Sequence, residues 1–248
     1  MIAIVSPAKK LNEKAIFPEN LPFTEPVFKD KAEKLADYLK KLSPDELQEL
    51  MQISEKLARL NHERYQNWTI EGAYPAIYLY AGDTYKGLDI QSFPKEKLPE
   101  LQKKLRIISG LYGLLRPLDL IAPYRLEMKT PLSYKNYKDL YDYWSEAVTR
   151  QLNEEAQGKP IVNLASKEYA AVIDKAKLQV PFIQVDFKDK RNGKYKTIGL
   201  YAKKARGNMA RWIAENGIEN PEDLKKFQGL GYRFSPELSS ENHLVFVR

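Results

Sequence analysis

The chain has 248 residues and a formal net charge of +7, from 40 lysines and arginines against 33 aspartates and glutamates. It contains no cysteine and only two histidines, which excludes disulfides, thiolate metal sites, a cysteine nucleophile and a histidine-rich metal centre. The apolar run at the N-terminus is too short for a signal peptide or a membrane span. We therefore expect a cytoplasmic protein with no membrane partner and no metal or other cofactor.

The first half of the chain alternates apolar runs with helical patterns. Residues 1–6 are continuously apolar and predict a buried strand, and residues 27–41 have helical periodicity. Ser43 is placed as an N-cap with Glu46 in capping-box register, and Ser54 can cap a further helix that runs to about residue 68. Residues 76–82 predict a second buried strand, and residues 94–108 predict an amphipathic helix.

The second half continues this alternation. Residues 138–155 predict a helix, and residues 160–165 a short strand followed by Ser166 as a possible cap. Asn192-Gly193 is the typical sequence of a type I′ hairpin between strands 182–189 and 194–202. A helix over 203–216 would end at Gly217, a short helix capped by Asn220 follows, and the tail suggests a closing strand pair.

The order of these elements predicts the fold class. Helices and strands alternate, but at least one hairpin is antiparallel, so we expect an α/β (mixed α+β) fold with a mixed sheet flanked by helices. No repeat, low-complexity stretch or linker interrupts the chain. We therefore expect one domain over residues 1–248, and a monomer is favoured.

The positive charge is concentrated in one segment. Residues 186–211 contain nine basic and two acidic residues, whereas the other 222 residues carry 31 of each sign. Such a concentration favours an anionic partner such as nucleic acid, nucleotide or phosphate. For residues 188–196, a solvated lysine-rich hairpin explains the charge at least as well.

Three predicted strands run into lysine at the expected start of a helix. The lysines are Lys9 and Lys10, Lys167, and Lys203 and Lys204. If the strands are parallel neighbours, these residues meet on the rim of the sheet where ligands of open α/β proteins bind. One such lysine is explained by solvation, but three together favour a site.

The helix predicted over 203–216 has a basic face. Projection places Lys204, Asn208 and Arg211 opposite the apolar stripe, with Gly207 beside them and Lys203 and Arg206 on the flank. Glycine lowers helix stability by about 1 kcal/mol relative to alanine, but it permits close approach of a ligand to the backbone. This face fits phosphate contact.

The segment 109–129 mixes glycines and charges in an apolar context. Gly110 and Gly113 bracket a tight turn. Four charged residues follow in this apolar stretch: Arg116, Asp119, Arg125 and Glu127. Charge is unfavourable in such surroundings unless it is paired. They form a structural ion-pair network or position a substrate, and Asp83 adds a carboxylate after a predicted strand.

Five segments resemble the YaaA family of peroxide stress proteins. They are SPAKKL at 6–11, GDTYKGL at 82–88, SGLYGLLRPLDLIAPYRLEM at 109–128, NLASKEY at 163–169 and YAKKARG at 201–207. The resemblance spans essentially the whole chain and implies a YaaA-type mixed α/β fold in a cytoplasmic bacterial protein. It also implies DNA binding through a basic cleft and a helix-hairpin-helix-like element, in a protein that limits damage when hydrogen peroxide meets intracellular iron.

The family's site positions can be transferred to this chain. The basic ones fall on Lys9, Arg116, Arg125, Lys203, Lys204 and Arg206, the acidic ones on Asp83, Asp119 and Glu127, and the hairpin on Ser109–Gly113. Lys10 and Arg211 join the basic set from the patterns above. The acidic residues are expected to support the basic ones as ion pairs.

Two functions remain open from the sequence. The first is binding of duplex or distorted duplex DNA through its phosphates, with little sequence preference. The second is an enzyme or ligand-binding protein for a nucleotide or another phosphorylated compound, with Asp83, Glu127 and Lys203 as candidate acid–base groups. No phosphate-loop or hydrolase motif is present, so no reaction is named and enzyme activity stays open. Direct iron binding ranks below both, because only oxygen ligands are available.

Overall fold

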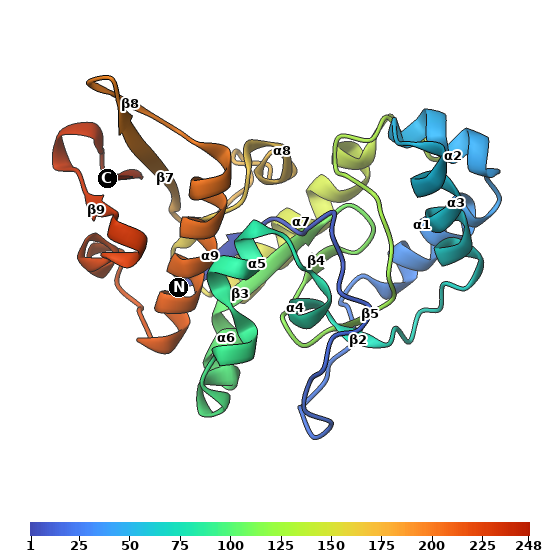
Figure 1. Ribbon diagram of the computed structural model, residues 1–248, viewed down its shortest axis with the longest axis horizontal. Coiled ribbons are helices and arrows are strands. Elements are labelled where there is room, and N and C mark those ends of the chain that lie inside the picture. The colour runs from blue at the N-terminus through green and yellow to red at the C-terminus, as the bar shows by residue number, and fades with distance from the viewer.

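The computed structural model describes all 248 residues, and a mixed eight-stranded sheet runs through its centre (Figure 1). Its strand order is β4-β3-β1-β6-β7-β10-β9, with β8 paired to β7. Strands β3, β1, β6, β7 and β10 are parallel, while β4, β8 and β9 run antiparallel to their neighbours. The predicted fold class is confirmed.

The strands have the following bounds. In the main sheet they are β1 (Ile2–Val5), β3 (Leu105–Ser109), β4 (Gly113–Leu115), β6 (Ile161–Asn163), β7 (Phe182–Arg191), β8 (Lys194–Lys196), β9 (Arg233–Phe234) and β10 (His243–Val247). A separate pair is formed by β2 (Tyr74–Pro75) and β5 (Leu120–Ile121). Strand β1 lies between β3 and β6 and is buried throughout, as its unbroken apolar sequence requires.

Helices lie around the sheet, and the first three helices of the chain form a group at the right of Figure 1. The helices are α1 (Lys29–Lys40), α2 (Pro44–Met51), α3 (Glu55–Gln66), α4 (Ala76–Leu79), α5 (Asp83–Leu88), α6 (Leu98–Lys104), α7 (Leu140–Ala156), α8 (Lys167–Ala170) and α9 (Gly199–Glu215). Short 3₁₀ helices lie at Ile90–Ser92, Lys95–Lys97, Pro221–Lys226, Gly229–Gly231 and Pro236–Leu238. None of the helices has the length and apolar character needed to cross a membrane.

Local start and turn signals are confirmed. Ser43 accepts a hydrogen bond from Glu46 N–H while the Glu46 side chain accepts from Ser43 N–H, which completes the capping box of α2. Ser54 caps α3 and Ser166 caps α8. Asn192 and Gly193 both have positive φ, as the turn between β7 and β8 requires.

Two predictions for buried apolar segments are wrong. Residues 76–79 form the helix α4 rather than a strand, and all four are buried. The helix predicted over 94–108 ends at Lys104, and residues 105–109 become β3, which pairs with β1. A short apolar run that is buried on all sides fits either structure equally well, so only the tertiary partners decide.

The predicted start of the last long helix is also wrong. Helix α9 begins at Gly199, and β8 ends at Lys196, so residues 202–204 are not the end of a strand. Lys203, Lys204 and Arg206 therefore lie in the second and third turns of α9. At that distance from the helix start, the macrodipole does not disfavour their charge.

The glycine turn is not part of a helix-hairpin-helix element. It joins the antiparallel strands β3 and β4, and Leu111 and Tyr112 at its tip are fully buried. A Cβ at Gly110 would overlap the backbone of Leu126, and Gly113 has a φ of +70° and lies against the ring of Trp144. Close packing inside the protein explains both glycines, and this turn has no surface to offer to DNA.

Candidate anion-binding site

A cavity lies where two parallel strands end. Because β1 and β6 pair in parallel, the segments that follow them emerge side by side. The cavity has a volume of about 420 Å³, and α5, α8 and α9 complete its wall. Its lining residues are Ser6, Pro7, Ala8, Lys9, Lys10, Gly82, Asp83, Thr84, Tyr85, Leu164, Ser166, Glu168, Tyr169, Lys203 and Arg206.

Hydrogen bonds hold the two strand ends together. Ser166 N–H donates to Ser6 Oγ at 2.8 Å, and Ser6 Oγ lies 3.3 Å from Ser166 Oγ. On the other side, Tyr85 OH donates to the backbone oxygen of Ser6 at 3.0 Å. The floor of the cavity is thus fixed by three elements, β1, α5 and the segment before α8.

Two glycines bring α5 and α9 into close contact. A Cβ at Gly207 would overlap the carbonyl oxygen of Thr84, and one at Gly87 would overlap that of Lys204. Gly207 therefore serves helix packing and not the approach of a ligand, which corrects its predicted role. The packing carries Lys203 and Arg206 to the cavity next to Asp83.

Arg206 is the most unusual side chain of the cavity. Its side chain is 14% exposed, its closest carboxylate is Asp186 at 3.8 Å, and its Nε is buried without a hydrogen-bond partner. Burial lowers the pKa of the Arg206 guanidinium, and the Asp186 charge only partly offsets this. Arginine stays protonated in proteins, so the site holds a poorly compensated buried cation.

The other charges of the cavity are also unbalanced. Lys10 and Lys203 have no ion-pair partner, whereas Lys9 is paired with Glu127. Asp83 lies 3.7 Å from Lys86 outside the cavity lining. The lining contains Lys9, Lys10, Lys203 and Arg206 against Asp83 and Glu168, an excess of two positive charges. A cavity with this balance favours an anionic ligand.

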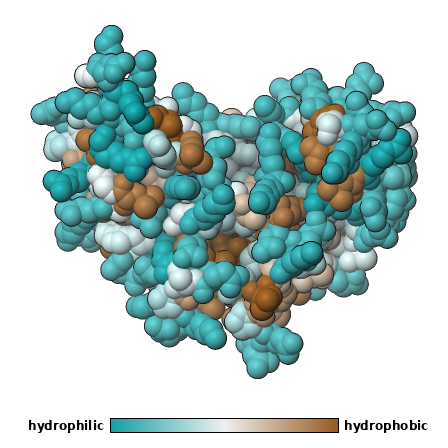
Figure 2. Space-filling view, in the orientation of Figure 1, coloured by the Kyte–Doolittle hydropathy of each residue, from teal (hydrophilic) through white to brown (hydrophobic).

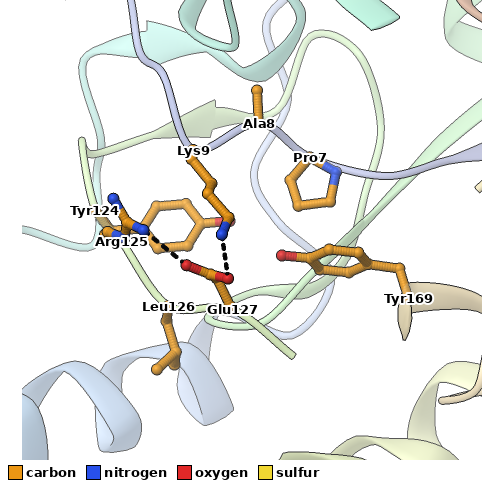
Figure 3. Close-up of a pocket in the computed structure, with 8 residues that line it drawn as sticks. All are labelled: Pro7, Ala8, Lys9, Tyr124, Arg125, Leu126, Glu127 and Tyr169. Atoms are coloured by element: carbon orange, nitrogen blue, oxygen red, sulfur yellow. Dashed lines mark hydrogen bonds and ion pairs between the residues drawn. The ribbon is translucent and has the colours of Figure 1, made fainter. Parts of the chain in front are cut away.

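A carboxylate with two cations lies beside the cavity (Figure 3). Glu127 Oε2 is 2.6 Å from Lys9 Nζ, and Arg125 Nη2 donates to Glu127 Oε1 at 2.8 Å. Burial raises the pKa of the Glu127 carboxyl, but the hydrogen bonds from Lys9 and Arg125 outweigh burial and hold the pKa below its usual range. This cluster fixes Lys9 at the edge of the cavity and shares the wall formed by Pro7, Ala8 and Tyr169.

Three of the predicted site residues make contacts within the protein and do not line the cavity. Two of them, Arg116 and Asp119, form an ion pair. Arg116 pairs with Asp119 at 3.0 Å and donates to the backbone oxygen of Glu25 at 2.8 Å, while Thr24 Oγ1 donates to Asp119 at 2.6 Å. Burial raises the pKa of the Asp119 carboxyl despite these bonds. The pair thus holds residues 24–25 against 116–119 and does not line the cavity.

Arg211 is the third of these positions. It donates to the backbone oxygens of Leu88, Asp89 and Ser92 and pairs with Glu215 at 2.8 Å, so it fastens α9 to the end of α5. Lys204 and Lys167 are not among the lining residues either. The structure therefore brings together Lys9, Lys10, Asp83, Lys203 and Arg206, with Arg125 and Glu127 adjacent.

The sequence reasoning missed several lining residues. Ser6 and Ser166 are the first hydroxyl residues after buried apolar segments, which is a signal that could have marked them. Tyr85 lies in the same short segment as Asp83. Asp186 contacts Arg206 from within a strand, and no local pattern indicates that contact.

The fold and the site together define a mixed α/β protein with a positively charged cavity at the carboxyl ends of its parallel strands. The chain belongs to the family described as peroxide stress protein YaaA, whose sequence model matches residues 1–238. It is 49% identical to a UPF0246 protein of Flavobacterium johnsoniae and 48% identical to one of Flavobacterium psychrophilum, over 100% of each chain. A UPF0246 protein of Idiomarina loihiensis is 46% identical over 100% of this chain and 98% of the relative.

Proposed function

We propose that this peroxide stress protein binds DNA through its phosphate backbone, with one phosphate held in the cavity by Arg206, Lys203 and Lys10. The observation that carries the proposal is the buried guanidinium of Arg206, whose Nε has no partner and whose closest carboxylate lies 3.8 Å away. A phosphate oxygen supplies the missing acceptor, and charge-assisted bonds of this kind are about twice as strong as neutral ones.

The shape of the molecule supports this proposal. Figure 2 shows a hollow at the upper edge, between the side that carries β7 and β8 and the side formed by α1–α3, and its walls are mostly hydrophilic. Phosphate contacts carry no sequence information by themselves. A protein that uses them is expected to bind different duplexes with similar affinity.

A second candidate is a nucleotide or another small phosphorylated compound. The cavity volume of about 420 Å³ lies within the range of small-molecule pockets, about 300–1,000 Å³. Asp83 and Glu168 also line it, and carboxylates repel a polyanion but suit acid–base work on a bound substrate. Under this alternative Asp83, Glu127 and Lys203 are the residues to examine for catalysis.

Binding of a short labelled duplex at several salt concentrations tests the first candidate. The variant Lys10→Gln/Lys203→Gln removes two cavity cations without touching the buried Arg206. We expect its affinity to fall for all sequences alike, and the slope of log K against log salt to decrease by about 0.9 for each phosphate that is no longer neutralised. Lys95→Gln/Lys103→Gln is the matched control, because both lysines are exposed on or near α6 outside the cavity.

Competition separates the two candidates. If millimolar nucleoside monophosphate displaces the duplex from wild type but not from the cavity variant, the cavity is shared by both ligands. Saturable binding of the nucleotide with no salt-dependent binding of any duplex supports the second candidate and rejects the first. Equal duplex affinity of wild type and the cavity variant at modest salt also rejects the first.

A further inference from the structure

The ribbon formed by β7 and β8 extends beyond the rest of the sheet. Residues 189–191 of β7 pair with residues 194–196 of β8, which has no other strand partner. In Figure 1 this ribbon projects at the upper left, beside the start of α9, and Figure 2 shows the projection as hydrophilic. The tight Asn192-Gly193 turn keeps its tip narrow.

The surface of the ribbon carries charge of one sign. Five basic residues lie within 188–196, and none has an ion-pair partner: Lys188, Lys190, Arg191, Lys194 and Lys196. Asp189 is the only acid of that stretch and is withdrawn from the surface. It is 6% exposed, accepts a hydrogen bond from Tyr232 OH at 2.8 Å and pairs with Arg248 at 2.6 Å.

An aromatic ring is exposed among these cations. Tyr195 is 40% exposed, and Lys190 Nζ lies 5.8 Å from its ring centroid. Lys190 and Tyr195 are cross-strand partners and share one face of the ribbon, while Arg191 and Lys194 share the other. Both faces of the tip therefore present cations that have no carboxylate partner in the protein, so like charges are concentrated here.

We propose that the tip of this ribbon, residues 190–195, is a second DNA contact that binds the phosphates bordering a groove of the duplex. The inference rests on the DNA binding proposed above. A two-stranded β-ribbon has the width that the major groove admits, and unpaired lysine and arginine on both faces meet the two phosphate backbones. The exposed Tyr195 adds a surface for packing against sugar or base.

Removal of charge from the tip tests the proposal in the full-length protein. The variant Lys190→Gln/Arg191→Gln/Lys194→Gln changes exposed residues only, and circular dichroism and thermal unfolding check that it is folded. The matched control is Lys95→Gln/Lys97→Gln/Lys103→Gln, which loses the same charge from exposed positions on or just before α6, in the lower part of the molecule in Figure 1 and away from the ribbon. Duplex affinity is measured for each variant over a range of salt concentrations.

We expect the affinity of the tip variant to fall by about tenfold or more and its salt slope to decrease by about two units, while the control stays close to wild type. Equal decreases in the two variants, or wild-type behaviour of the tip variant, would overturn the proposal. If the tip variant binds like wild type while the Lys10→Gln/Lys203→Gln variant binds more weakly, the proposal for the ribbon fails but the proposal of DNA binding at the cavity stands. Absence of duplex binding in wild type overturns both proposals together.

Discussion

Among individual residues, the two arginines near the cavity differ in how their charge is balanced. Arg125 donates to Glu127 at 2.8 Å, so its charge has a partner within the protein. Arg206 makes no hydrogen bond to a carboxylate, and Asp186, its closest acid, is also engaged by His243 at 2.9 Å. Nε of both arginines is buried without a hydrogen-bond partner, but only Arg125 donates a hydrogen bond to a carboxylate, so Arg206 is the arginine that leaves a role for an anionic ligand.

The Glu127 cluster predicts a pH-dependent contribution to stability. The pKa of Glu127 in the folded protein lies below its usual value, so its contribution is complete above the unfolded-state pKa of about 4.3 and disappears as pH falls through the folded pKa. Glu127→Gln should lower the free energy of unfolding by about 1–2 kcal/mol at pH 7.

Denaturant unfolding of both proteins between pH 7 and pH 3 measures this effect. The difference between wild type and Glu127→Gln should shrink as pH falls below the unfolded-state value. Glu154→Gln is the control, because Glu154 is exposed and unpaired. A difference that stays constant over this range would contradict the assignment.

Among the secondary-structure elements, the packing of α5 against α9 determines which basic residues of α9 reach the cavity. The helix face that carries Gly207 and Arg211 packs on α5 and the residues after it, and does not face a ligand. The flank with Lys203 and Arg206 reaches the cavity. Which face of a helix is covered depends on its neighbour, and the periodicity of one helix does not contain that information.

Gly207→Ala tests this packing. Alanine is the better helix former by about 1 kcal/mol, but its Cβ would overlap the carbonyl oxygen of Thr84. We expect a net destabilisation of about 2 kcal/mol, within the range of overpacked cores, together with weaker ligand binding at the cavity. Thermal and denaturant unfolding measure it.

Gly199→Ala provides the comparison for this substitution. Gly199 is the first residue of the same helix, and nothing lies within 4 Å of an added Cβ. This variant should be as stable as wild type or slightly more stable. Equal effects of the two substitutions would show that helix propensity, and not the contact with α5, governs position 207.

In the molecule as a whole, one acidic residue joins three distant parts of the chain. Glu219 pairs with the amino group of Met1 at 3.0 Å, with Lys159 at 3.0 Å and with Lys104, which is 2% exposed. Burial raises the pKa of the Glu219 carboxyl, but hydrogen bonds from these three groups outweigh it and hold the pKa far below its usual range. The network anchors the start of β1 to the end of α6.

Glu219→Gln should therefore destabilise the protein. The substitution leaves Lys104 buried without its close carboxylate, and we expect the free energy of unfolding to fall by about 2 kcal/mol or more. Glu222→Gln is the matched control, because Glu222 pairs only with the neighbouring Lys225 on an exposed surface. Similar midpoints of denaturant unfolding for both variants would contradict this role of Glu219.

Features that depend only on neighbouring residues could be predicted from the sequence. The capping box of Ser43 and Glu46 and the Asn192-Gly193 turn involve hydrogen bonds or backbone angles within a few residues. They therefore do not depend on contacts with distant segments of the chain. The charge excess of residues 186–211 is likewise a property of the chain.

What those charges do depends on contacts between distant segments. Short segments rich in apolar residues, such as 76–79 and 105–109, can be buried as a helix or as a strand, and their tertiary partners select between the two. The cavity draws Ser6, Asp83, Ser166 and Arg206 from four separate segments, whose meeting depends on parallel pairing and on the contact between α5 and α9. Such contacts leave no periodic pattern in a single sequence, which is why only the packed fold revealed them.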